Sequence, residues 1–111
     1  MRLFIRCVEG DVRLGPGKIQ LLEMISVHGS ISEAARAMDM SYRRAWLLVA
    51  DLNQCFRQPV TTTQTGGKGG GHAQLTAFGQ SLIDRYRKIE RDATAAVADQ
   101  LDQLKGELAA V

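Results

Sequence analysis

The sequence GSISEAARAMDMSYRRAWLLVADLN, residues 29–53, predicts two short helices joined by a tight turn. Ser30 and Glu33 are spaced as a capping box, in which the serine hydroxyl bonds a backbone N–H and the glutamate reaches back to the serine N–H. A helix is therefore expected over about 31–38. Its two consecutive alanines would let a second helix cross closely.

The turn and the second helix complete a recognisable spacing. Asp39 and Met40 form the turn, because aspartate accepts the left-handed backbone conformation at modest cost. Ser41 is a second N-cap, so the next helix is expected over about 42–56. This is the spacing of a helix-turn-helix, whose second helix enters the DNA major groove.

The second helix is predicted to be amphipathic. Its inward face would hold Ala45, Leu48 or Val49, and Leu52. The other face would carry Tyr42, Arg43, Trp46, Leu47 and Ala50. A surface with tyrosine, arginine and tryptophan suits a groove better than it suits plain solvent. Two interpretations of Trp46 are open: an exposed contact residue, or a core residue packed on a neighbouring element.

A strand pair and another helix are expected before this motif. Alternating Leu3, Ile5 and Cys7 predict a strand, and residues 12–14 are placed to pair back on it. A helix is expected over about 16–28, begun by a proline and ended by a glycine. Its apolar face would be formed by Ile19, Leu21, Leu22 and Ile25.

A β-hairpin, or wing, is expected over residues 60–75. Two short β-branched or apolar stretches flank the glycine-rich run TGGKGGGH, residues 65–72. The run lacks the pattern of a phosphate-binding P-loop. Lys68 at its tip suits contact with a phosphate or the minor groove. The alternative is a disordered linker. His72 is interpreted as a hairpin residue, because no ligand partner lies at metal-site spacing.

A long last helix is expected from the cap Thr76 to about residue 105 or beyond. Its apolar positions are Leu82, Tyr86, Ile89, Ala93, Val97, Leu101, Leu104 and Leu108. These steps of three and four approximate a heptad seam with one stutter. The start of the seam would pack on the rest of the chain. The remainder needs a partner chain, so a homodimer is expected.

Length and composition restrict the class of protein. With 111 residues and a hydrophobic content of 45%, the chain forms one domain and a tail element. No apolar run approaches the length of a membrane span, and early charges argue against a signal peptide. Cys7 and Cys55 lack the spacing of a zinc site or a disulfide framework. We expect a cytoplasmic protein with no membrane partner and no metal.

The net charge of +2 is unevenly distributed. Residues 41–72 carry four basic side chains against the single acidic Asp51, an excess of three positive charges. The flanking segments are close to neutral. A local basic surface suits phosphate contact, although four cations also fit an ordinary solvated surface.

An ordered set of motifs resembles one regulator family. The motifs are Gly29-Ser30-Ile31-Ser32 with Ala34-Ala35, Ser41-Tyr42-Arg43-Arg44-Ala45-Trp46, Leu52-Asn53, Gly66-Gly67-Lys68-Gly69-Gly70-Gly71 and Leu75-Thr76-Ala77-Phe78-Gly79. Together they resemble the N-terminal domain of ModE-type molybdate-responsive regulators, which is similar to the winged domain of LysR-type regulators. The resemblance covers about residues 15–90.

The resemblance implies a winged helix-turn-helix that dimerises through long terminal helices and binds a palindromic operator. It implies that the DNA-contacting residues are Ser41, Tyr42, Arg43, Arg44, Trp46 and Lys68. Molybdate-binding members carry further C-terminal oxyanion modules, and no residues here match that motif. We therefore expect no cofactor. A separate sensor protein, another route for the signal, and regulation by abundance alone are the open hypotheses.

The sequence thus predicts a mainly α protein with a small β-hairpin. Residues 1–75 would form the winged helix-turn-helix domain, and residues 76–111 the dimerisation helix. The expected function is a dimeric regulator that binds specific double-stranded DNA. The alternative is a protein-interaction adaptor that uses the winged fold and long helix. No nucleophile–base pair or carboxylate pair indicates an enzyme.

Overall fold

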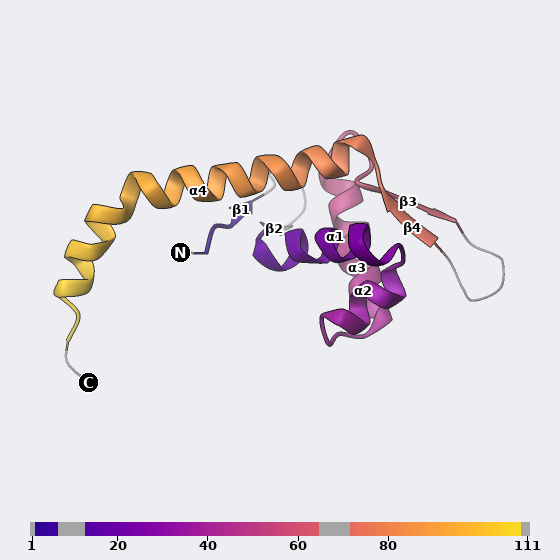
Figure 1. The fold of residues 1–111 in the computed structure, drawn as a ribbon, viewed down its shortest axis with the longest axis horizontal. Helices are drawn as coiled ribbons and strands as arrows, with labels where there is room; N and C mark the ends of the chain where they lie inside the picture. Colours follow the sequence, from indigo (N-terminus) through magenta and orange to yellow (C-terminus); the bar gives the residue numbers. More distant parts are fainter. Residues whose placement is uncertain (1, 7–12, 65–71, 110–111) are drawn as a thin grey trace.

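The computed structural model describes residues 2–6, 13–64 and 72–109. The elements in chain order are β1 (Ile5–Arg6), β2 (Arg13–Leu14), α1 (Pro16–His28), α2 (Ile31–Ala37), α3 (Tyr42–Cys55), β3 (Thr61–Gln64), β4 (His72–Leu75) and α4 (Ala77–Gly106). Helices α1 to α3 form a bundle beside the first half of α4, whose second half extends away from it (Figure 1). The molecule measures 57 × 32 × 25 Å along its principal axes.

Helix α1 has the bounds that its terminal residues predict. Pro16 occupies its first position, where the missing N–H costs no helical hydrogen bond. Gly29 ends it with φ of 76°, and its N–H donates to the Ile25 carbonyl at 2.8 Å. The left-handed conformation favours glycine at this position. The predicted apolar face is confirmed, since Ile19, Leu21, Leu22 and Ile25 are all buried.

The caps of α2 and α3 explain the helix-turn-helix. The Ser30 hydroxyl accepts from the Glu33 N–H at 3.0 Å, and the Ser41 hydroxyl accepts from the Arg44 N–H at 3.1 Å. Asp39 has φ of 55°, which confirms the left-handed turn. The capping box differs from expectation in its second half: the exposed Glu33 carboxylate lies 3.7 Å from the Arg36 guanidinium, one helical turn along.

One hydrophobic core joins the bundle, the hairpin and the start of α4. Its buried apolar residues are Leu14, Ile19, Leu21, Leu22, Ile25, Ile31, Ala34, Ala35, Ala45, Val49, Leu52, Val60, Ala73, Leu82, Ile83 and Tyr86. Three alanines, Ala34 and Ala35 on α2 and Ala45 on α3, permit the close packing of these helices. Ile83 lies outside the predicted seam, yet it is buried because both α1 and the hairpin pack beneath α4.

Strands β3 and β4 form the predicted hairpin. They are antiparallel, with Thr61 opposite Leu75 and Thr63 opposite Ala73. The hairpin base is tied to the bundle, because the Ala73 N–H donates to the Gly29 carbonyl at 2.9 Å. His72 begins β4, as expected of a hairpin residue. The glycine-rich tip and Lys68 lie outside the described residues.

Helix α4 has a buried first third and an exposed remainder. The Thr76 hydroxyl caps it by accepting from the Gly79 N–H at 2.9 Å. Leu82 and Tyr86 are buried, as predicted for the start of the seam. Ile89, Leu104 and Leu108 are instead 45%, 63% and 71% exposed. Among the described residues, no side chain of the seam beyond Tyr86 is buried.

The N-terminal strands lie beside α4. Ile5 of β1 pairs with Leu14 of β2, which confirms the predicted ribbon over the described residues, and Cys7 falls outside them. The buried Tyr86 hydroxyl donates to the Leu3 carbonyl, a contact the sequence did not suggest. Among the residues described, no helix combines the length and the apolar character that crossing a membrane requires.

Candidate nucleic-acid interface

Helix α3 presents an exposed face made of the residues predicted for it, except that Ala50 is half-buried. Tyr42, Trp46 and Leu47 are 56%, 49% and 46% exposed. Arg43 and Arg44 are also exposed on the first turn. Ala45, Val49 and Leu52 form the buried inward face, whereas Leu48 is only half-buried. The structure thus excludes the core interpretation of Trp46, because its side chain lies on the exposed face.

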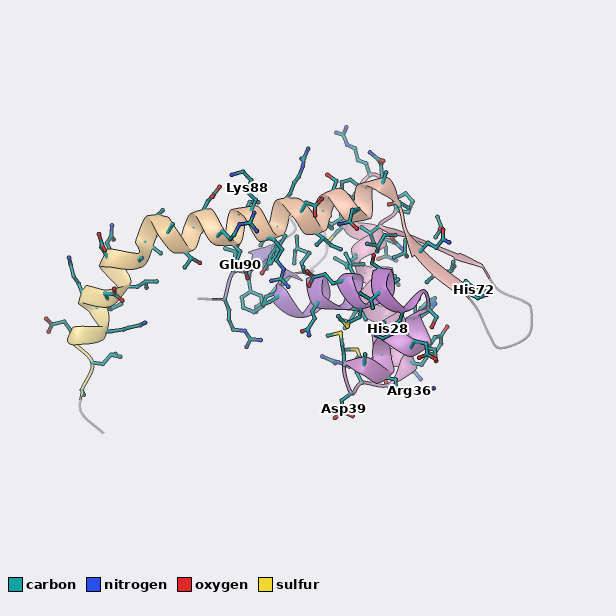
Figure 2. All side chains as sticks on the ribbon, in the orientation of Figure 1. His28, Arg36, Asp39, His72, Lys88 and Glu90 are labelled. Atoms are coloured by element: carbon teal, nitrogen blue, oxygen red, sulfur yellow. The ribbon has the colours of Figure 1, made fainter. Side chains whose placement is uncertain are left out.

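The start of α3 lies at the end of the bundle that is farthest from α4. Figure 2 shows this position through Arg36 and Asp39, which mark the end of α2 and the turn before α3. The bulk of the molecule therefore does not cover the first turn of α3. This turn can approach a large ligand, with α2 and the turn beside it.

The far end of α3 is fixed by contacts that the sequence did not reveal. The Asn53 side-chain oxygen accepts from the Val60 N–H at 2.8 Å and so ties α3 to the start of the hairpin. Phe56, just beyond α3, packs on Phe78 of α4 with ring centroids 5.3 Å apart. The resemblance included Asn53 in a motif, but local spacing gives no signal of its partner seven residues away.

Exposed cations outnumber acidic side chains within α3 and the segment that follows it, over described residues 41–64. Arg43, Arg44 and Arg57 are exposed, and the one acidic side chain among described residues 41–64 is the half-buried Asp51. Hydrogen-bond donors and positive charge on a protruding surface suit an anionic ligand. Lys68 belongs to the same predicted surface but lies outside the described residues.

The described residues offer little other chemistry. They contain no group of three or more histidine, cysteine or acidic side chains placed to hold a metal ion. In Figure 2, His28 lies on the bundle and His72 on the hairpin. Cys55 is half-buried. The exposed α3 face is therefore the site with the clearest chemical character in the described part of the chain.

The sequence also gave no indication of an ionic contact between α1 and α4. Arg87 on α4 donates to both carboxylate oxygens of Glu23 on α1, at 2.7 and 3.4 Å, and to Glu90 at 3.0 Å. The hydrogen bonds that Arg87 donates to these two carboxylates raise the pKa of its guanidinium, and the bond to Glu23 contributes most. The ion pairs of Arg36 with Glu33 and of Lys88 with Asp92, in contrast, each lie within one helix.

Comparison with known proteins places the motifs in context. Over 87 residues the chain is 44% identical to the DNA-binding transcriptional dual regulator ModE of Escherichia coli, covering 76% of this chain and 33% of that protein. It is 42% identical over 88 residues to the molybdenum-pterin-binding protein MopA of Rhodobacter capsulatus, covering 79% of this chain and 33% of MopA. The ModE of Yersinia pestis is 37% identical over 99 residues, which cover 86% of this chain and 38% of that protein.

The comparison confirms the resemblance that the motifs indicated. The match to ModE regulators covers roughly three quarters of this chain or more. The chain spans about a third of the length of the relatives it matches. No family model matches the chain.

Proposed function

Because the chain is ModE-like over most of its length, we propose that it is a dimeric regulator that binds specific sites on double-stranded DNA. The observation that carries this proposal is the first turn of α3. It combines exposed Tyr42, Arg43, Arg44 and Trp46 with a firm packing of α3 on its buried side. The Escherichia coli relative is a DNA-binding transcriptional regulator, and an exposed surface with two arginines supports the same function here.

In this proposal α3 enters the major groove with its N-terminal turn leading. Arg43 and Arg44 donate to guanine edges or phosphates, since bidentate arginine–guanine pairs are the commonest specific contact. Ser41 and Tyr42 lie at the backbone, and Trp46 makes apolar contact within the groove. The hairpin with Lys68 reaches the neighbouring backbone or minor groove.

Dimerisation follows from the unpaired seam of α4. Two copies related by a two-fold axis would bury Val97, Leu101 and Leu104 against their counterparts. The two α3 helices would then meet successive major grooves, about 34–36 Å apart, on a palindromic site. A separate sensor protein that controls this dimer stays a prediction.

Selection of bound sites from random DNA tests the proposal directly. A palindromic consensus is expected, with two half-sites one helical turn apart. On that site, Arg43→Ala and Arg44→Ala should each weaken binding roughly tenfold, because one good base contact contributes about 1–3 kcal/mol. Arg91→Ala is the matched control, since it removes the same charge from an exposed position of α4. Unchanged affinity in both α3 variants would sink the assignment of this helix.

A protein-interaction adaptor remains the second candidate because of one observation. Tyr42, Trp46 and Leu47 give α3 an exposed apolar surface, which also fits a protein partner. Binding to random DNA distinguishes the two functions. A regulator releases DNA steeply as salt rises, through counterion release from its phosphate contacts, whereas an adaptor shows no salt-sensitive DNA binding at all.

A further inference from the structure

The junction at which α4 leaves the bundle carries a specific ionic contact. Leu82, Ile83 and Tyr86 are the last buried side chains of α4. Arg87 is the next residue, and beyond Glu90 no described side chain of this helix is buried. The contact of Arg87 with Glu23 and Glu90, here called the Arg87 clamp, therefore sits where the supported part of the helix ends.

The clamp connects two elements that are distant in sequence. Glu23 lies 64 positions before Arg87, on the face of α1 that borders a polar groove under α4. The Arg87 guanidinium is also 5.9 Å from the centroid of the Tyr86 ring. Both acids and the arginine are half-buried, with exposed fractions of 22–33%. Partial burial weakens screening by solvent and salt.

We propose that Arg87 is a positioning residue: by holding Glu23, it fixes the direction of the free half of α4 relative to the bundle and so sets the half-site spacing that the dimer accepts. This inference rests on the proposed DNA-binding dimer for its functional part. Its mechanical part, the fixed direction of α4, concerns the single chain.

A small change in the direction of α4 would displace its far end by several ångströms. Residues 90–106 extend about 24 Å at 1.5 Å per residue. A tilt of about 10° at the clamp would displace the far end by about 4 Å, close to the 3.4 Å between successive base pairs. Both protomers would tilt, so the two α3 helices would move relative to each other by a distance on the order of one base-pair step.

The ionic contact suits this role better than the apolar packing beside it. Apolar burial is non-directional and tolerates small rotations of one helix on another. A guanidinium that donates two bonds to one carboxylate fixes both distance and orientation. The neighbouring Lys88 is exposed and forms a different kind of ion pair. Its partner Asp92 lies on α4 as well, so this pair does not connect α4 to another element. Figure 2 shows Lys88 on the side of α4 away from the bundle and Glu90 on the side toward it.

A DNA-free measurement tests the mechanical part. Spin labels on cysteines introduced at Ala37 and Gln100, both exposed, report the direction of α4 in a chain whose two native cysteines are serine. The labelled chain is diluted into unlabelled chain. Arg87→Gln and Glu23→Gln should each shift or widen the distance distribution by on the order of 4 Å. Lys88→Gln, the matched control, should leave it unchanged.

Two results would contradict the proposed role of the Arg87 clamp. An unchanged distribution in Arg87→Gln and Glu23→Gln would show that apolar packing alone directs α4. A change in Arg87→Gln without one in Glu23→Gln would show that the contact with α1 is irrelevant, because Glu90 lies on α4 itself.

The functional part is tested on sites whose half-site spacing is altered by one or two base pairs. The unaltered chain should prefer one spacing, and each clamp variant should reduce that preference roughly tenfold. The double variant should do no more than either single one, since both remove the same contact. An intact spacing preference in both variants contradicts the inference. Failure of the unaltered chain to bind any selected site contradicts the proposed function instead, and the label distances still test the clamp.

Discussion

At the residue scale, Gly79 shows how a close approach restricts a position. It is buried in the first turn of α4, where a Cβ would overlap the Val60 carbonyl oxygen at the hairpin base. Alanine favours a helix over glycine by about 1 kcal/mol, but overpacking against backbone typically costs about 1–3 kcal/mol. We expect Gly79→Ala to lower the free energy of unfolding in urea by about 1 kcal/mol or more.

Gly17 of α1 is the matched control for this prediction. A Cβ there would meet no atom within 4 Å, so Gly17→Ala should leave stability unchanged or raise it. If the two substitutions have equal effects on the urea midpoint, the contact with Val60 does not limit the size of residue 79.

Tyr86 predicts a pH dependence of stability at the same scale. Burial, with a smaller contribution from Glu90, raises the pKa of its phenol above 10. The folded chain therefore favours the neutral phenol, so this stabilisation is complete below about pH 10 and is lost as the pH rises through the raised pKa. Tyr86→Phe should cost about 1 kcal/mol at neutral pH, because the bond to Leu3 is lost, and should remove this decline above pH 10.

The exposed Tyr42 provides the comparison for Tyr86. Tyr42→Phe removes an exposed phenol from α3, so it should leave the stability at pH 7 unchanged. Unfolding curves at pH 7 and pH 11 measure both variants. Equal declines in the unaltered chain and in Tyr86→Phe would contradict the raised pKa as a source of pH dependence.

The hydrogen bonds of a residue could be predicted from the sequence where the bonding partner is close in the chain. Ser30, Ser41 and Thr76 each accept a bond from a backbone N–H three residues on, and such caps follow from residue type and spacing. The bond from Tyr86 to Leu3 spans 83 positions, and the bond from Arg87 to Glu23 spans 64. No local pattern encodes these partners, because the packing of separate elements brings them together.

At the scale of elements, the cap of α3 joins stability to the proposed interface. Ser41 bonds the first turn, on which Tyr42, Arg43 and Arg44 lie. Ser41→Ala should lower the free energy of unfolding by about 1 kcal/mol. Ser41→Asp should restore stability, since aspartate is also a good N-cap, yet weaken DNA binding further by adding a negative charge beside the phosphates.

The two substitutions separate capping from contact. Urea unfolding measures the cap, and titration against the selected site measures the contact. Ser32→Ala, at an exposed position of α2, controls for loss of a hydroxyl. If Ser41→Asp binds DNA as tightly as the unaltered chain, then the first turn of α3 does not lie near phosphate.

The bounds of the helices and of the hairpin could be predicted to within a residue or two. Their burial could be predicted less completely. Helix α3 ends at Cys55 where the pattern predicts about residue 56, and the hairpin and α4 form as expected. Periodicity and caps suffice because each helix or strand satisfies most of its own backbone bonds. The burial of Ile83 was missed because a seam pattern describes one side of α4, whereas this helix packs on both α1 and the hairpin.

At the scale of the whole molecule, the long axis of 57 Å reflects an unsupported helix. Residues 91–106 of α4 extend beyond the bundle (Figure 1). Their apolar stripe is half-buried or exposed. An isolated helical segment of this length is marginal in water, so burial of that stripe would stabilise this half of α4. A second copy of the chain would offer the same stripe, so the proposed dimer would cover this half of α4.

Loss of the apolar stripe tests the proposed dimer. Removing residues 94–111, or introducing Leu101→Lys with Leu104→Lys into the stripe, should shift the chain toward monomer and weaken binding to a palindromic site, because each half-site is then held separately. Ala96→Lys with Gln103→Lys adds the same charges at exposed positions off the stripe and should leave dimers intact. Sedimentation at low micromolar concentration measures the association. A truncated chain that is still fully dimeric would place the interface elsewhere, and equal dissociation by both lysine pairs would assign the effect to charge and not to the stripe.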